Sequence, residues 1–144
     1  MRLEDSILKK SLQELDGQDW GEPTYHSHLV TEYHRLRRVP LEKLNVENLR
    51  LLIGQSMSLE ALPYLLPVAS EHLLREPWAA GDYYEGDLLQ SVLGVPAPFW
   101  HFHPELKCML DQIVRRALLQ VAKAEPQDVV LYDANILQLL QKWQ

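Results

Sequence analysis

The chain has 144 residues, 47% of them hydrophobic, which suits a single domain with its own core. A net charge of −6 disfavours nucleic acid as a direct partner, because the phosphates would be repelled. The single cysteine, Cys108, excludes an internal disulfide and is typical of a reducing compartment. There is no signal-peptide pattern and no apolar run of about 20 residues. We therefore expect one cytoplasmic domain over residues 1–144 that makes no contact with a membrane.

The charge is unevenly distributed. Residues 1–22 carry a net charge of −3, and residues 77–104 carry −3 with neither Lys nor Arg. Acidic segments of this kind suit a cationic protein partner, whose approach they accelerate by electrostatic steering. Residues 23–40 carry a net charge of +2 and contain three arginines: Arg35, Arg37 and Arg38. We interpret the arginines as a solvated helix end, where positive charge favours the helix dipole.

Apolar residues at helical spacing predict a first helix over residues 3–15, which Asp16-Gly17 would end with a left-handed C-cap. Pro23 suits the first turn of a second helix that continues to about Arg38. Val39-Pro40 ends this helix, because the residue before a proline is biased away from the helical conformation.

The middle of the chain predicts shorter elements. Leu41 to Leu44 can form one turn, and Asn45 is a suitable N-cap for a helix over residues 46–53 that Gly54 closes. Residues 59–75 have a helical apolar pattern interrupted by Pro63 and Pro67. Because two prolines cannot share one first turn, this segment predicts either a kink or a helix that starts near Pro67.

The last third of the chain is also helical in pattern. We expect a helix over residues 86–93, one turn over 97–102, a long helix from Pro104 to about Val121, and a last helix over 133–143. Residues 129–132 are the only short run suited to a strand, and one strand makes no sheet. The fold class is therefore all-α, a compact bundle of about seven short-to-medium helices.

The histidines and the cysteine do not follow a recognised metal or catalytic pattern. His26 and His28 would face opposite sides of a helix, and His101 and His103 lack the paired ligands of a structural zinc site. Cys108 lies in a helical pattern beside apolar Met109, and we interpret it as a core or boundary residue. The sequence contains no nucleophile elbow and no phosphate loop. We expect no metal, no cofactor, no catalytic residue and no enzymatic activity.

Gly81 to Leu89 is the most unusual stretch of the sequence. Two glycines bracket Asp82, Tyr83, Tyr84 and Glu85, and a third carboxylate follows at Asp87. Aromatic side chains give large contact area at low entropic cost, so this combination suits a basic protein partner better than a small substrate. The alternative is that the aromatic residues belong to the core and that Asp82 or Asp87 caps a helix.

Five further motifs are SLQELDGQDWGEP (11–23), LRRVPL (36–41), LNVENLRLLIGQ (44–55), LPYLLP (62–67) and GDYYEGDLL (81–89). They occur in the order in which they are found in the contact-dependent growth inhibition (CDI) immunity proteins, a family that the sequence resembles over about residues 11–110. Glu85 departs from that pattern, where proline is expected, and residues 56–61 make a longer connection than usual.

The resemblance implies a protein that binds the C-terminal domain of a cognate CDI toxin in the cytoplasm and blocks its active site. Many such toxins are nucleases, and some are ribonucleases. A nuclease groove is normally basic because it must attract phosphate, so an acidic inhibitor competes with the substrate. The alternative is a helical adaptor or regulatory module unrelated to toxins, and a small metal-dependent enzyme is a third hypothesis.

Within the resemblance, motifs shared by proteins that meet different toxins are better suited to hold the fold than to recognise a partner. We assign this structural role to Trp20, Gly54, Gly81, Gly86 and Asp87, with Asp87 as a helix cap. We assign toxin binding to Asp82, Tyr83, Tyr84 and Glu85.

Overall fold

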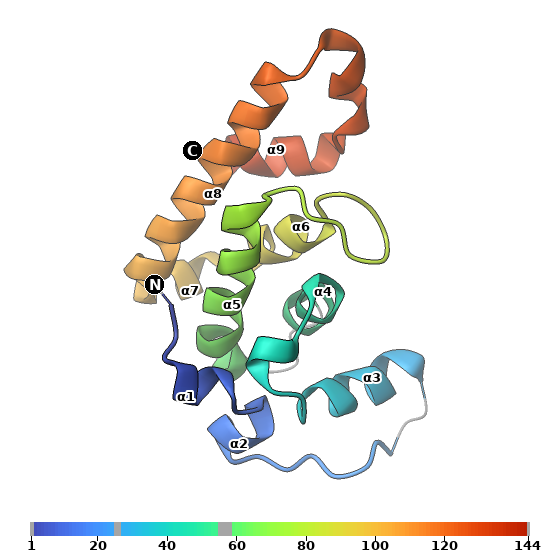
Figure 1. Cartoon of the computed structure of the whole chain (residues 1–144), viewed down its shortest axis with the longest axis vertical. Coiled ribbons are helices and arrows are strands. Elements are labelled where there is room, and N and C mark those ends of the chain that lie inside the picture. Colours follow the sequence, from blue (N-terminus) through green and yellow to red (C-terminus); the bar gives the residue numbers. More distant parts are fainter. Residues whose placement is uncertain (1, 25–26, 55–58, 144) are drawn as a thin grey trace.

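The computed structural model describes residues 2–24, 27–54 and 59–143. Within these ranges the chain is helical and has no strand, only an isolated antiparallel bridge between Ala80 and Glu85 (Figure 1). The predicted all-α class is confirmed. The described residues form nine α-helices and three 3-10 helices: α1 Asp5–Leu8, α2 Leu12–Asp16, α3 His28–Leu36, η1 Leu41–Lys43, α4 Val46–Gly54, η2 Leu59–Ala61, α5 Leu62–Arg75, α6 Asp87–Leu93, α7 Ala97–Phe102, α8 Pro104–Lys123, η3 Pro126–Leu131 and α9 Ala134–Trp143.

The predicted first helix is divided into two short ones, and Ser11 is the reason. Its side chain accepts a hydrogen bond from the Glu14 backbone N–H, while the Glu14 carboxylate accepts one from the Ser11 N–H. This reciprocal capping box starts a new helix at Leu12. Gly17 then ends α2 in the left-handed conformation, as the sequence predicts.

The second helix starts later than predicted. It begins at His28, where the Ser27 hydroxyl accepts a hydrogen bond from the Val30 N–H, and not in the turn after Pro23. A serine N-cap satisfies an otherwise unpaired helix N–H, which Pro23 cannot do. His26, half of one histidine pair considered above, lies outside the described residues, as do residues 56–58 of the longer connection.

The helices α4 and α5 agree more closely with their patterns. Asn45 and Asn48 exchange hydrogen bonds between side chain and backbone at the start of α4, so the predicted N-cap is present. The next helix, α5, starts at Leu62 and continues through Pro67, so of the two alternatives the start near Pro67 is wrong. Pro63 lies in the first turn, where its missing N–H has no partner to lose.

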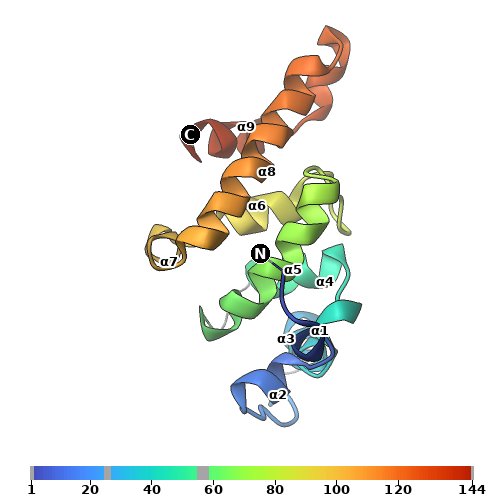
Figure 2. The same cartoon turned by 60° about the vertical axis from the view of Figure 1, so that its left-hand side comes forward.

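The core is built where α5 packs between α4 and α8, and α6 lies against α4 (Figures 1 and 2). With 20 residues, α8 is the longest helix, about 30 Å long at 1.5 Å per residue. Its buried face continues the core toward α9. Fully buried side chains from these helices include Leu49, Leu66, Leu89, Leu110 and Ile136.

The C-terminal segment folds back along α8. Residues 129–132, considered above as a possible strand, lie in and just after η3. Asp133 then caps α9 by accepting hydrogen bonds from the N–H groups of Asn135 and Ile136. None of the helices in the described ranges is long and apolar enough to cross a membrane.

Candidate functional site

The segment from Gly81 to Gly86, which we call the acidic loop, leads into α6 and projects from one side of the molecule (Figure 1). Its four central residues, Asp82, Tyr83, Tyr84 and Glu85, are all exposed. Tyr83 is 71% exposed and Tyr84 43%. The aromatic residues of the loop therefore lie on the surface and not in the core, and the fold leaves two rings and two carboxylates facing solvent.

Asp87 organises the loop from the inside. It is 3% exposed, and its carboxylate accepts hydrogen bonds from the N–H groups of Gly81 (2.6 Å), Tyr83 (3.2 Å) and Tyr84 (3.5 Å). The N-cap position of α6 belongs to Gly86, so Asp87 closes the loop instead of capping the helix as predicted. A carboxylate that accepts several backbone N–H bonds fixes the path of the chain around it.

A second carboxylate supports the loop from α4. Glu47 Oε1 accepts a hydrogen bond from the Asp82 N–H (2.9 Å) and one from Arg50 Nε (2.6 Å). Arg50 also lies 4.4 Å from the centroid of the Tyr83 ring and 3.9 Å from the Asp87 carboxylate. Hydrogen bonding from Arg50 holds the pKa of Glu47 below its ordinary value, with the Asp82 N–H acting in the same direction. The loop thus rests on an ion pair that stays charged at neutral pH.

Two of the glycines closely approach the groups that hold this site. Gly86 has a φ of +89°, and a Cβ there would lie 2.7 Å from the Trp78 ring. A Cβ at Gly81 would lie 2.6 Å from Glu47 Oε1. Gly54, the third predicted structural glycine, lies beside Ser91, where α4 meets α6. Two further bonds, from the Tyr84 hydroxyl to Gln90 Oε1 and from the Gly86 N–H to the Trp78 carbonyl, tie the loop to its neighbours.

Trp20, the remaining predicted structural residue, lies in a second cluster, against residues of α3 and the arginine that follows it. Its ring stacks on Tyr33 with centroids 5.5 Å apart, and the Arg37 guanidinium lies 4.3 Å from its centroid. Arg37 is only 1% exposed and pairs with Asp16 at 2.7 Å. The expected solvated arginine triplet is therefore wrong at Arg37, because α2 brings a carboxylate to it. A sign in the sequence was that Arg37 follows the inward-facing Tyr33 by four residues, which places both side chains on the same face of the helix.

Two hollows are lined by tyrosines of the acidic loop. One, of about 730 Å³, lies between Tyr84 and Glu85 on one side and η3 with the start of α9 on the other. The second, of about 430 Å³, is lined by Tyr83, Tyr84 and Leu29 among others. Five of the eight large hydrophobic side chains exposed in the described ranges border these hollows: Leu29, Tyr83, Tyr84, Val130 and Leu131. Sequence reasoning named the two tyrosines but missed the three aliphatic residues.

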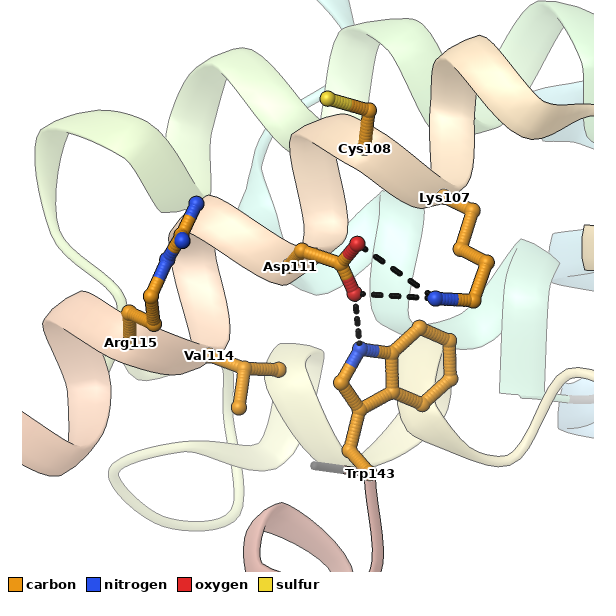
Figure 3. A pocket seen from close by; sticks show the side chains of 6 residues that line it. All are labelled: Lys107, Cys108, Asp111, Val114, Arg115 and Trp143. Carbon is orange, nitrogen blue, oxygen red and sulfur yellow. Dashed lines mark hydrogen bonds and ion pairs between the residues drawn. The ribbon is translucent and has the colours of Figure 1, made fainter.

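A third hollow, of about 340 Å³, lies on α8 beside the end of α9 (Figure 3). The Asp111 carboxylate accepts hydrogen bonds from Lys107 Nζ and from the Trp143 indole N–H at 2.8 Å. These groups satisfy one another and fasten α9 to α8. Cys108, which we expected at the core or its boundary, is exposed at the edge of this hollow.

The histidines do not form a metal centre in the described part of the chain, where no three His, Cys, Asp or Glu residues are placed to hold an ion. His103 stacks on Phe99 with ring centroids 4.2 Å apart, and His101 makes an edge contact with Phe102. Both imidazoles are thus engaged with neighbouring aromatic rings.

A family model described as CDI immunity proteins matches residues 14–110, about two thirds of the chain. The matched segment contains the acidic loop together with Glu47, Arg50 and Asp87, and it stops before η3 and α9. No match was found among curated proteins or among solved structures.

Proposed function

Because the chain belongs to the family of CDI immunity proteins, which neutralise a toxin, we propose that it binds the C-terminal domain of a cognate CDI toxin in the cytoplasm and covers that domain's active site. The acidic loop makes the contact, through Asp82, Tyr83, Tyr84 and Glu85. The protein acts as a stoichiometric inhibitor and catalyses no reaction.

The observation that carries this proposal is the contrast between the two sides of the loop. Its backbone N–H groups bond inward to Asp87 and Glu47, while its rings and carboxylates face outward without a described protein partner other than Arg50 and Gln90. A loop already held in one conformation loses little entropy on binding. Tyrosines on such a frame are the side chains that most often dominate the energy of an interface.

The charge of the loop favours a nuclease as the toxin, including a ribonuclease. The active-site groove of a nuclease is basic, because it must attract phosphate. Asp82 and Glu85 are both exposed, and no Lys or Arg lies between residues 77 and 104. Carboxylates that enter such a groove replace the phosphates of the substrate and are attracted by the same field.

The direct test uses the toxin encoded beside this protein. The purified pair should form a stable complex, and cells that express the toxin should survive when this chain is co-expressed. The toxin's nuclease activity on RNA and DNA should fall in proportion to the immunity protein added, reaching zero near one equivalent. A wild-type chain that neither binds nor protects would overturn the proposal.

The contact surface is tested by charge reversal. Asp82→Lys with Glu85→Lys should slow association with the toxin at low salt and flatten its salt dependence, because steering is lost. The matched control is Glu4→Lys with Glu42→Lys, which changes the net charge equally at two exposed carboxylates near α1 and η1. Equal effects of the two double variants would show that only the net charge of the protein, and not the position of the loop carboxylates, governs association.

A further inference from the structure

The groove between the acidic loop and the C-terminal segment has two walls of different origin. Tyr84 and Glu85 form one wall, and residues 129–134 with Leu137 form the other. The first wall lies inside the segment that matches the family model, and the second lies outside it. Any function of the second wall therefore belongs to this chain's own C-terminal segment.

The second wall exposes apolar side chains that the fold does not use. Val130 is 82% exposed and Leu131 72%, and η3 has no buried residue. The segment is nevertheless held where η3 meets α9. Tyr132 packs edge-on against Trp78 with ring centroids 4.7 Å apart, and Asp133 caps α9. Exposed aliphatic groups on a fixed frame are typical of a binding surface.

Carboxylates surround these apolar side chains. Glu85 is exposed and lines the groove, and Asp133 lines it as well. Asp128 is exposed in the neighbouring hollow, which Lys123 also lines. A groove with an apolar floor and an acidic rim is complementary to a basic element that carries an aliphatic or aromatic side chain at its tip. A second copy of this chain would bring its own acidic rim against this one, and like charges oppose that contact.

We infer that this groove is a second contact for the toxin domain, in which a basic, protruding element of the toxin inserts an apolar side chain between Tyr84 and the Val130–Leu131 pair. This inference rests on the proposed function, since it gives the same partner a second point of attachment. The loop draws the toxin in by charge, and the groove retains it by apolar burial. The two contacts should therefore affect different rate constants.

The test is Val130→Ala with Leu131→Ala, measured against the purified cognate toxin domain. Both side chains are exposed, so the thermal midpoint of the free protein should stay unchanged. Affinity should fall about tenfold or more through faster dissociation, with the association rate and its salt dependence close to those of the wild type. The control is Phe102→Ala, which removes another side chain that is 76% exposed, on α7 at the opposite end of α8 from η3 (Figure 1).

The outcomes separate this inference from the function beneath it. A wild-type chain that does not bind the toxin contradicts the proposed function itself. If the wild type binds and the groove variant dissociates no faster, the immunity function stands and the groove contact is wrong. If the groove variant instead abolishes self-association of the free chain, seen by light scattering, a second copy occupies the groove and the inference is likewise overturned.

Discussion

Two clusters of this protein combine the same three kinds of group, an arginine, a carboxylate and an aromatic ring, but one is buried and the other is open to solvent. In one, Arg37 pairs with Asp16 and lies over the Trp20 ring. In the other, Arg50 pairs with Glu47 and lies over the Tyr83 ring at nearly the same distance. The first arginine is fully buried, whereas the second lies beneath a tyrosine whose outer face is open to solvent.

The difference shows how one interaction serves either the fold or a surface. The pair of Arg37 with Asp16 joins α2 to the end of α3, so the loss of Arg37 should destabilise the N-terminal segment. Arg50 instead supports a tyrosine from below and leaves its other face for a partner. We therefore expect changes in the first cluster to act on stability and changes in the second to act on binding.

The largest effect should come from Arg37→Ala. It leaves Asp16 buried without its partner, and breaking a buried pair in this way costs about 3–5 kcal/mol. Chemical denaturation with urea measures the loss. The control is Arg35→Ala, whose pair with Glu32 is exposed and should contribute at most about 1 kcal/mol. Equal losses for the two variants would contradict the contrast between buried and open clusters.

Asp87→Asn tests the inner side of the acidic loop. It keeps the size of the side chain but removes the charge that accepts three backbone N–H bonds, so stability should fall by about 2 kcal/mol. Hydrogen exchange should quicken at the amides of Gly81, Tyr83 and Tyr84. Unchanged exchange at these amides would show that Asp87 does not hold the loop.

Trp20 and Tyr83, the aromatic residues of the two clusters, give the sharpest comparison between an effect on stability and an effect on binding. Trp20→Ala should cost about 2 kcal/mol, since a half-buried ring loses about half of what a core ring loses. Tyr83→Ala should change stability by less than about 0.5 kcal/mol, yet it should weaken toxin binding about tenfold or more. Calorimetry of the free proteins and titration with the toxin separate the two effects. A Tyr83 variant that binds normally would remove the loop from the interface.

The smallest expected effect is in the dependence of stability on pH. The folded pKa of Glu47 is depressed by Arg50, so its contribution is complete above the unfolded value of about 4.3 and is lost as pH falls through the folded value. Between pH 6 and pH 3 the free energy of unfolding should therefore fall more steeply for the wild type than for Glu47→Gln. Parallel curves would show that the pair adds nothing to the fold.

The sequence predicted those features that depend on neighbouring residues. The all-α class, the Asn45 cap, the end of α2 at Gly17 and the start of α8 at Pro104 all follow from short-range chemistry. The exposure of residues 82–85 agrees with their interpretation as a binding surface, and the alternative that the two tyrosines belong to the core is wrong.

Features that depend on residues distant in the sequence could not be predicted from short-range patterns. The basic triplet looked solvated until α2 placed Asp16 against Arg37, 21 residues away. Asp87 looked like a helix cap, but its hydrogen bonds run back to the loop before the helix. The groove was missed because its walls are about 45 residues apart in sequence, and only the return of α9 along α8 brings them together.

Hydroxyl-radical footprinting of the chain, free and bound to its toxin, tests the central claim most directly. Tyr83, Tyr84 and Leu131 are exposed in the free protein, and so is Phe102, which serves as an internal reference. The account predicts that oxidation of the first three falls sharply in the complex while oxidation of Phe102 is unchanged. Protection of Phe102 with the loop and groove still fully reactive would contradict it.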